Sequence, residues 1–134
     1  MKKILVIDDS PFYAKLMGDK LPKKDYEVLV AHDGEEGLKM VEEKKPDLIL
    51  LDLAMPKLDG IGFLKRAQAD QGPIKIPVLI FSNSNDLDKV SEGVALGVKG
   101  YIVKSLETLE TIVDSVRNAL EEADLKKKEE EAVK

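Results

Sequence analysis

The sequence predicts an α/β protein in which a five-stranded parallel sheet is doubly wound by helices in a (βα)5 series. Five short, largely apolar runs bounded by turn residues suit strands, at residues 3–7, 26–30, 48–51, 76–81 and 100–104. Segments with apolar residues at helical spacing separate these runs. The third run, Leu48 to Leu51, is apolar at every position, which is typical of a strand covered by helices on both faces.

The first three helices are expected at residues 11–21, 35–45 and 60–69. The first has an approximate apolar stripe of Phe12, Leu16, Met17 and Leu21. Pro11 suits its first position, where the missing N–H would have no intrahelical partner.

Two further helices should follow the fourth and fifth strands. The fourth helix ends near Gly97 and is expected to face the core through its apolar residues, Leu87, Val90 and Val94. The last helix is expected to be capped by Ser105, with an apolar stripe from Leu106 to Ala123.

Composition excludes several classes of protein. The absence of cysteine rules out disulfides, thiolate metal sites and thiol nucleophiles. The apolar runs are too short to span a bilayer, and a net charge of −5 argues against a nucleic-acid surface. We therefore expect a cytoplasmic protein with no membrane insertion and no bound nucleic acid. The domain should comprise residues 1–123, and residues 124–134 should form a charged, solvated helical extension or tail.

Polar groups stand at the ends of four of the five predicted strands: Asp8 and Asp9, Asp52, Ser82 and Lys104. Because the carboxyl ends of parallel strands meet at one edge of a sheet, we expect these side chains to converge. Three carboxylates repel one another unless a cation lies among them, and Mg²⁺ suits one or two carboxylates together with a phosphate. Asp52 would then be a nucleophile towards phosphorus, with Lys104 and Ser82 beside the transferred group.

These motifs resemble those of the response-regulator receiver domains of two-component signalling, in particular the single-domain chemotaxis regulators. The resemblance runs from Lys2 to about Glu122 and implies a flavodoxin-like topology. The motifs that carry it are the Asp8-Asp9 pair, Asp52 with Met55-Pro56 and Asp59-Gly60 behind it, Ser82, and the segment from Gly97 through Tyr101 to Lys104.

The resemblance implies that Asp52 accepts a phosphoryl group from a histidine kinase or a phosphotransfer protein. It implies a Mg²⁺ site made by Asp9, Asp52 and the backbone carbonyl of Ala54, with Asp8 acting through water. Ser82 and Lys104 would contact the phosphoryl group. Ser82 and Tyr101 would form a switch that remodels the face of the fourth helix, fifth strand and fifth helix, where an output partner binds.

The sequence departs from the family at two positions beside this site. Ser105 stands where proline usually follows the lysine, and Asn83 stands where a small residue usually follows the hydroxyl. The lysine–proline bond of relatives is usually cis, but a cis bond before serine costs roughly 2.5–4 kcal/mol. We therefore predict a trans Lys104–Ser105 bond.

Three other functions compete with this interpretation. A haloacid-dehalogenase-like Mg²⁺ phosphohydrolase would also use an aspartyl nucleophile, but it needs a second acid where Ala54 stands. A receiver-like scaffold that is not phosphorylated would not need the full set of acids, Ser82 and Lys104. A flavodoxin-like flavin binder would need a phosphate loop where Asp8 and Asp9 stand. We therefore expect a phosphorylated binding module rather than a turnover enzyme.

Overall fold

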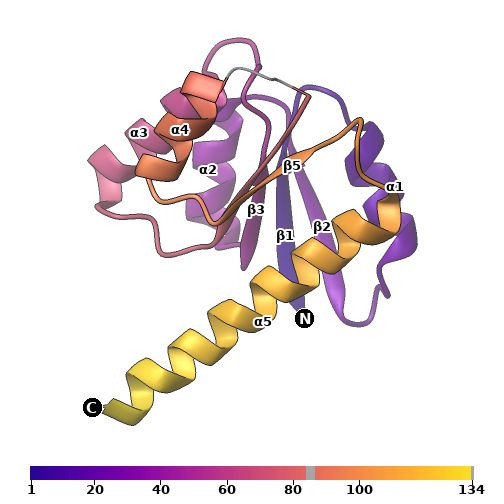
Figure 1. Ribbon diagram of the computed structural model, residues 1–134, viewed down its shortest axis with the longest axis vertical. Helices are drawn as coiled ribbons and strands as arrows, with labels where there is room; N and C mark the ends of the chain where they lie inside the picture. The colour runs from indigo at the N-terminus through magenta and orange to yellow at the C-terminus, as the bar shows by residue number, and fades with distance from the viewer. Residues whose placement is uncertain (84–86, 134) are drawn as a thin grey trace.

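The computed structural model describes residues 1–83 and 87–133, in which strands and helices alternate along the chain (Figure 1). The elements are β1 (Lys2–Ile7), α1 (Phe12–Lys20), β2 (Tyr26–Ala31), α2 (Gly34–Lys44), β3 (Leu48–Leu51), α3 (Gly60–Gln71), β4 (Val78–Ser82), α4 (Leu87–Ala95), β5 (Gly100–Val103) and α5 (Leu109–Val133). The predicted α/β class and the predicted parallel sheet are confirmed.

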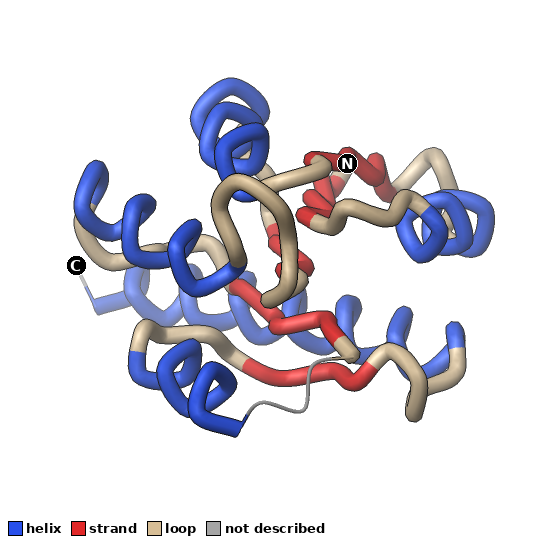
Figure 2. Tube along the Cα trace, turned by 90° about the horizontal axis from the view of Figure 1, so that it is seen from above, coloured by secondary structure: helices blue, strands red, loops and turns tan. Residues whose placement is uncertain are grey.

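The strands form one parallel sheet in the order β2-β1-β3-β4-β5, with helices on both of its sides (Figure 2). The central pairing aligns Ile4 with Leu48 and Ile7 with Leu51, so β1 and β3 end at the same level. One apolar layer packs α1 and α5 against the sheet, and a second packs α2, α3 and α4 against its other face. This order places the ends of β1, β3, β4 and β5 next to one another.

Two glycines let helices approach the sheet closely. A Cβ at Gly37 in α2 would lie 2.7 Å from Cδ1 of Ile7, and a Cβ at Gly93 in α4 would lie 2.7 Å from Cδ1 of Ile80. Gly37 is unfavourable inside a helix by about 1 kcal/mol relative to alanine, and the close packing on β1 explains why it is there.

Three predictions about apolar residues of α1 and α4 are wrong. Leu87 and Val94 are 74% and 58% exposed, because α4 touches the sheet most closely at Gly93 and these two residues lie off that contact. Phe12 is 59% exposed, and α1 reaches the core through Tyr13, Ala14 and Met17 instead.

The start of the last helix also differs from the prediction. Leu109 begins α5, and Oγ1 of Thr108 accepts a hydrogen bond of 3.2 Å from the backbone N–H of Thr111. Ser105 therefore does not cap this helix, and Leu106, expected to begin its apolar stripe, precedes it and is 79% exposed. The N–H of Ser105 instead donates to Oδ1 of Asn83, and the N–H of Leu106 donates to the carbonyl of Val103 in a turn.

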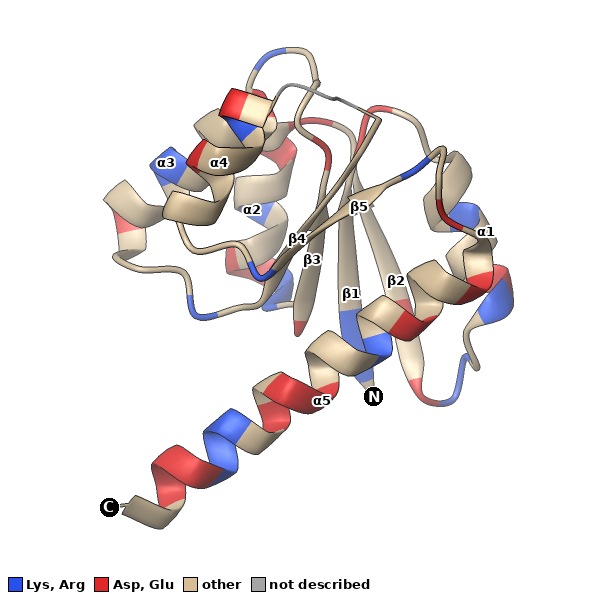
Figure 3. Ribbon diagram, viewed as in Figure 1, with Lys and Arg blue, Asp and Glu red and all other residues tan. Residues whose placement is uncertain are grey.

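Helix α5 continues past the sheet, and its far end stands clear of the other elements (Figure 1). Acidic and basic residues dominate this free end (Figure 3). No break in the helix marks the predicted domain boundary at residue 123, which stays a prediction. In the described part of the chain, none of the helices has the length and apolar character needed to cross a membrane.

Candidate functional site

Three carboxylates meet at the carboxyl edge of the sheet. Asp8 and Asp9 follow β1, Asp52 follows β3, and one carboxylate oxygen from each lies within 4.8 Å of the others. Ser82 ends β4, and Lys104 directly follows β5. The structure thus brings together the polar groups that the sequence places at separate strand ends.

Asp52 is buried and bonded to three different residues. Oγ of Ser82 donates to its Oδ1 at 2.6 Å, and the backbone N–H of Ala54 approaches the same oxygen at 3.4 Å. Nζ of Lys104 lies 3.4 Å from Oδ2. The backbone N–H of Asp52 donates to the carbonyl of Ile7, so the residue is fixed in the sheet while its side chain faces the site.

The turn after Asp52 fixes it from behind. Oδ1 of Asp59 accepts a hydrogen bond of 2.7 Å from the N–H of Gly62 and so caps α3. The N–H of Gly60 donates to the carbonyl of Leu53. A Cβ at Gly60 would lie 2.4 Å from the carbonyl oxygen of Asp52, so only glycine allows α3 to begin so close to the site.

Lys104 is almost fully buried, and its ammonium bonds to the carboxylates of both Asp8 and Asp52. A buried cation without such partners would be strongly destabilising. Nζ also lies 5.5 Å from the ring centroid of Tyr13 and 5.2 Å from that of Phe81, within the range of cation–π attraction. Sequence reasoning missed these two aromatic neighbours.

The two acids after β1 differ in environment. Asp8 is 1% exposed, and burial raises the pKa of its carboxyl, although hydrogen bonds from Lys104 and from the N–H of Ser10 oppose this shift. Asp9 is exposed at the rim of the site. A hydrated cation at the rim could therefore reach Asp9 directly.

The donor set fits a hard divalent cation. The three ionised carboxylates carry three negative charges, and the ammonium of Lys104, which pairs with Asp8 and Asp52, offsets one of them within this group; the remaining two match the charge of one Mg²⁺. All the candidate side-chain ligands are carboxylate oxygens, the ligand type that Mg²⁺ prefers.

Tyr101 and Ala54 lie at the margins of the site. Tyr101 is half-buried in β5, opposite Ile80, and packs into the apolar layer beneath α4. Ala54 is exposed in the loop after Asp52. The roles that the resemblance implies for these two residues stay predictions.

The two departures from the family pattern contact each other. Oδ1 of Asn83 accepts a hydrogen bond of 2.8 Å from the backbone N–H of Ser105. The Lys104–Ser105 bond is trans, as predicted. A pairing between the side chain of one loop and the backbone of another depends on tertiary structure, and nothing in the local sequence indicates it.

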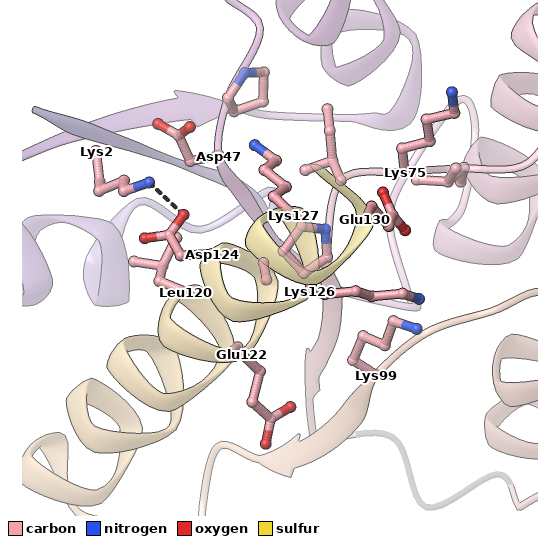
Figure 4. Close-up of a pocket in the computed structure, with 16 residues that line it drawn as sticks. Lys2, Asp47, Lys75, Lys99, Leu120, Glu122, Asp124, Lys126, Lys127 and Glu130 are labelled. Carbon is pink, nitrogen blue, oxygen red and sulfur yellow. Dashed lines mark hydrogen bonds and ion pairs between the residues drawn. The ribbon is translucent and has the colours of Figure 1, made fainter. Parts of the chain in front are cut away.

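A cleft of about 590 Å³ lies at the opposite edge of the sheet, between the strand starts and α5 (Figure 4). It is far from Asp52, since Lys2 begins β1, and Asp47 and Lys99 directly precede β3 and β5. Its lysines are interspersed with acids, and Lys2 is paired with Asp124 at 2.9 Å. We find no arrangement of groups there that resembles a reactive site.

The model of the response regulator receiver domain matches residues 4–123. The chain belongs to the response regulator receiver domain family. Such domains are signalling proteins of two-component systems, and phosphorylation on aspartate is typical of them.

Curated relatives of this receiver domain are longer proteins. It is 43% identical over 104 residues to the alkaline phosphatase synthesis transcriptional regulatory protein PhoP of Bacillus subtilis, a match that covers 77% of this chain and 42% of PhoP. It is 34% identical over 123 residues to a protein-glutamate methylesterase/protein-glutamine glutaminase of Syntrophomonas wolfei, covering 89% of this chain and 34% of that protein. The chain thus spans less than half the length of these two relatives.

Solved structures include receiver domains of the same size. Chemotaxis protein CheY4 of Vibrio cholerae superimposes with a TM-score of 0.76 at 29% identity, covering 89% of this chain and 98% of that one. The receiver domain of the Francisella response regulator 1452 gives a TM-score of 0.77 at 28% identity, covering 91% and 98%. The match to nearly the whole of both chains extends the family assignment to the complete (βα)5 fold.

Proposed function

We propose that this receiver domain accepts a phosphoryl group on Asp52 from a histidine kinase or a phosphotransfer protein and signals through a phosphorylation-dependent binding surface. The observation that supports this most is the contact of Asp52 with both Ser82 and Lys104. The carboxylates of Asp8 and Asp9 lie within 4.8 Å of it. The carboxylate of Asp52 thus contacts both the hydroxyl of Ser82 and the ammonium of Lys104.

In the proposed reaction a carboxylate oxygen of Asp52 attacks phosphorus, and the bond between phosphorus and the donor breaks. The donor nitrogen leaves with the electron pair of that bond and is then protonated. The product is an acyl phosphate on Asp52. Lys104, which now contacts the carboxylates, would shift its ammonium towards a phosphoryl oxygen, and Ser82 would turn its hydroxyl to another.

Asp9, Asp52 and the backbone carbonyl of Ala54 would hold Mg²⁺, with Asp8 acting through water. A bound Mg²⁺ would neutralise negative charge on the transferred group. The closeness of the Asp9 carboxylate to that of Asp52 supports this assignment, and both Asp9 and Ala54 are exposed, so solvent can reach them.

The residue two positions after Asp52 argues against a phosphohydrolase. Such an enzyme needs a second acid two residues after its nucleophile, and Ala54 offers none. We propose that the chain is phosphorylated and loses its own phosphate without turning over a separate substrate. Hydrolysis of a small phosphomonoester at many turnovers per chain would contradict this proposal.

The output partner is proposed to bind on the face made by α4, β5 and α5. Large apolar side chains are exposed in α4, at Leu87 and Val94, and in the loop before α5, at Leu106. Tyr101 lies half-buried in β5, the middle element of this face. Movement of Ser82 towards a phosphoryl group would free space for Tyr101 to turn inwards and change this face.

The proposed partners are proteins only. A net charge of −5 does not favour nucleic acid, and the DNA-binding function of longer relatives belongs to those proteins. A phosphodonor of this type is made from ATP, so we propose that the chain acts in the cytoplasm. A pull-down with and without beryllofluoride, which mimics the aspartyl phosphate, would identify the partner.

The decisive experiment is phosphorylation with acetyl phosphate and Mg²⁺, followed by mass spectrometry. We expect the wild type to gain one phosphoryl group that maps to Asp52, and Asp52→Asn to gain none. Asp70→Asn, a change of the same type at an exposed position in α3, should be labelled like the wild type. Equal labelling of Asp52→Asn would overturn the assignment.

A further inference from the structure

We propose that Asn83 is a positioning residue for Lys104, acting through the backbone N–H of Ser105. This inference deepens the proposed function. Only the contact between Lys104 and a phosphoryl group rests on that function. The geometric part, that Asn83 sets where the Lys104 ammonium lies, stands independently of any phosphorylation.

The first observation is a continuation of the sheet by a side chain. The pairing of β4 with β5 ends at Ser82 and Val103, and the N–H of Lys104 still donates to the carbonyl of Ser82 at 3.2 Å. The next N–H, that of Ser105, donates to Oδ1 of Asn83 at 2.8 Å. Asn83 thereby adds one more link between the two loops, directly after the residue that carries the ammonium.

The second observation concerns the other side of the same peptide group. The hydroxyl of Tyr13 lies 3.5 Å from the carbonyl oxygen of Lys104, and the rings of Tyr13 and Phe81 pack edge-to-face with centroids 5.0 Å apart. The Lys104–Ser105 peptide is therefore held by α1 on its C=O side and by Asn83 on its N–H side. Its orientation fixes where the lysine side chain starts.

The third observation is that the two departures from the family pattern explain each other. A proline at position 105 would have no N–H to donate, and a small apolar residue at position 83 would have no oxygen to accept. In this chain both halves of the hydrogen bond are present. Asn83 and Ser105 thus act as a pair that fixes a trans peptide beside the site.

Loss of the Asn83–Ser105 hydrogen bond should have a moderate but measurable effect on the affinity of the site for a phosphoryl analogue. A hydrogen bond of this kind contributes a factor of about 2 to 12 to an equilibrium constant. Misplacing a reacting group by 1 Å can cost up to about 100-fold in rate. We therefore expect loss of the Asn83 acceptor to weaken beryllofluoride binding with Mg²⁺ by about 2- to 12-fold.

Two pairs of variants test the proposal. Asn83→Leu keeps the size of the side chain and removes the acceptor, whereas Asn83→Asp keeps both. Ser105→Pro removes the donor, whereas Ser105→Ala removes only the hydroxyl and keeps the N–H. Melting temperature would report on folding in every variant.

The main readout is spectroscopic. Lys104 lies beside two aromatic rings, so its side-chain protons should show ring-current shifts in the NMR spectrum. We expect these shifts to change in Asn83→Leu and Ser105→Pro and to stay near wild-type values in Asn83→Asp and Ser105→Ala. Exchange of the Ser105 amide proton should accelerate in Asn83→Leu and be restored in Asn83→Asp.

Two results would overturn the positioning role of Asn83, and a third would overturn its effect on the phosphoryl site. The first is an unchanged Ser105 exchange rate and unchanged Lys104 shifts in Asn83→Leu. The second is a Ser105→Ala variant that behaves like Ser105→Pro. The third is an Asn83→Leu variant whose Lys104 shifts move while its beryllofluoride affinity equals that of the wild type. The position of Lys104 would then not control binding of the phosphoryl analogue. The NMR readouts need no phosphoryl chemistry, so a wild type that acetyl phosphate fails to label would overturn the proposed function alone.

Discussion

Ser82 donates a hydrogen bond of 2.6 Å from its Oγ to Oδ1 of Asp52, so the hydroxyl and the proposed phosphoacceptor are direct partners. Both side chains are buried, Ser82 at 1% and Asp52 at 7% exposure. The same oxygen is approached by the N–H of Ala54 only at 3.4 Å. Ser82 is therefore the stronger of these two donors to the Oδ1 atom, and its hydroxyl would have to turn when that oxygen becomes bonded to phosphorus.

We predict that Ser82→Ala lowers the free energy of unfolding by about 1.5–3 kcal/mol in metal-free buffer, because a buried carboxylate loses a donor. Ser82→Thr keeps the hydroxyl and should retain most of that stability. Urea unfolding of the three proteins is the measurement. A Ser82→Ala protein as stable as the wild type would show that the hydroxyl does not support Asp52.

Asp9 provides the second prediction, because it combines exposure with closeness to two other carboxylates. Asp9→Ala should leave stability unchanged or raised in metal-free buffer, since like-charge repulsion is relieved. Mg²⁺ at 100 times its dissociation constant should stabilise the wild type by about 2.7 kcal/mol, and the variant much less. Thermal melting over a Mg²⁺ titration measures both effects.

The control for this experiment is Asp19→Ala, which removes an exposed carboxylate from α1. Its melting temperature should rise with Mg²⁺ as that of the wild type does. The same rise in Asp9→Ala would contradict the proposed ligand role of Asp9.

The strand ends explain why so much of the site could be predicted. Asp8, Asp52, Ser82 and Lys104 each follow an apolar run, and a parallel sheet brings such positions to one edge. The convergence of these groups can therefore be predicted from the parallel sheet alone, without knowing how the side chains pack.

The rest depends on contacts that local sequence does not show. The ring of Tyr13 in α1 lies near the Lys104 ammonium and packs edge-to-face on Phe81 of β4, a contact between three elements that are far apart in the sequence. The exposure of Leu87 and Val94 follows from the closeness of Gly93 to Ile80. The spacing of apolar residues along one helix does not indicate how closely that helix approaches a strand.

Asp33 gives a prediction about pH. It caps α2 by accepting a hydrogen bond of 2.8 Å from the N–H of Glu36, and Lys57 lies 3.7 Å away. The Glu36 N–H, followed by the positive charge of Lys57, lowers the pKa of the Asp33 carboxyl below its usual value. A depressed pKa stabilises the fold above the unfolded-state pKa, and this contribution is lost as pH falls through the folded-state value.

Asp33→Ala should therefore cost about 1 kcal/mol of unfolding free energy at neutral pH. The difference from the wild type should shrink below about pH 4, near the unfolded-state pKa of aspartate. Asp33→Asn keeps a capping oxygen and should be more stable than Asp33→Ala at neutral pH. Urea unfolding between pH 3 and pH 7 provides the test, and a difference that does not vary with pH would rule out the carboxylate as its source.

The proposed domain boundary at residue 123 predicts the outcome of shortening α5. Residues 125–133 are exposed, and Leu120 is the last residue of the helix that is buried in the core. The Lys2–Asp124 ion pair lies just inside this limit. Deletion of residues 126–134 should therefore change the free energy of unfolding by no more than about 0.5 kcal/mol, the range of ordinary surface changes.

Deletion from residue 120 onwards is the matched comparison. It removes the buried Leu120 and the partner of Lys2, and loss of a buried leucine alone costs about 2–5 kcal/mol when it is shortened to alanine. The shorter deletion also removes Lys126, Lys127 and Glu130 from the wall of the cleft at the amino edge of the sheet (Figure 4). If deletion of residues 126–134 destabilised the protein by more than about 1 kcal/mol, these residues in the wall of the cleft would contribute to the fold. The domain would then have to extend beyond residue 123.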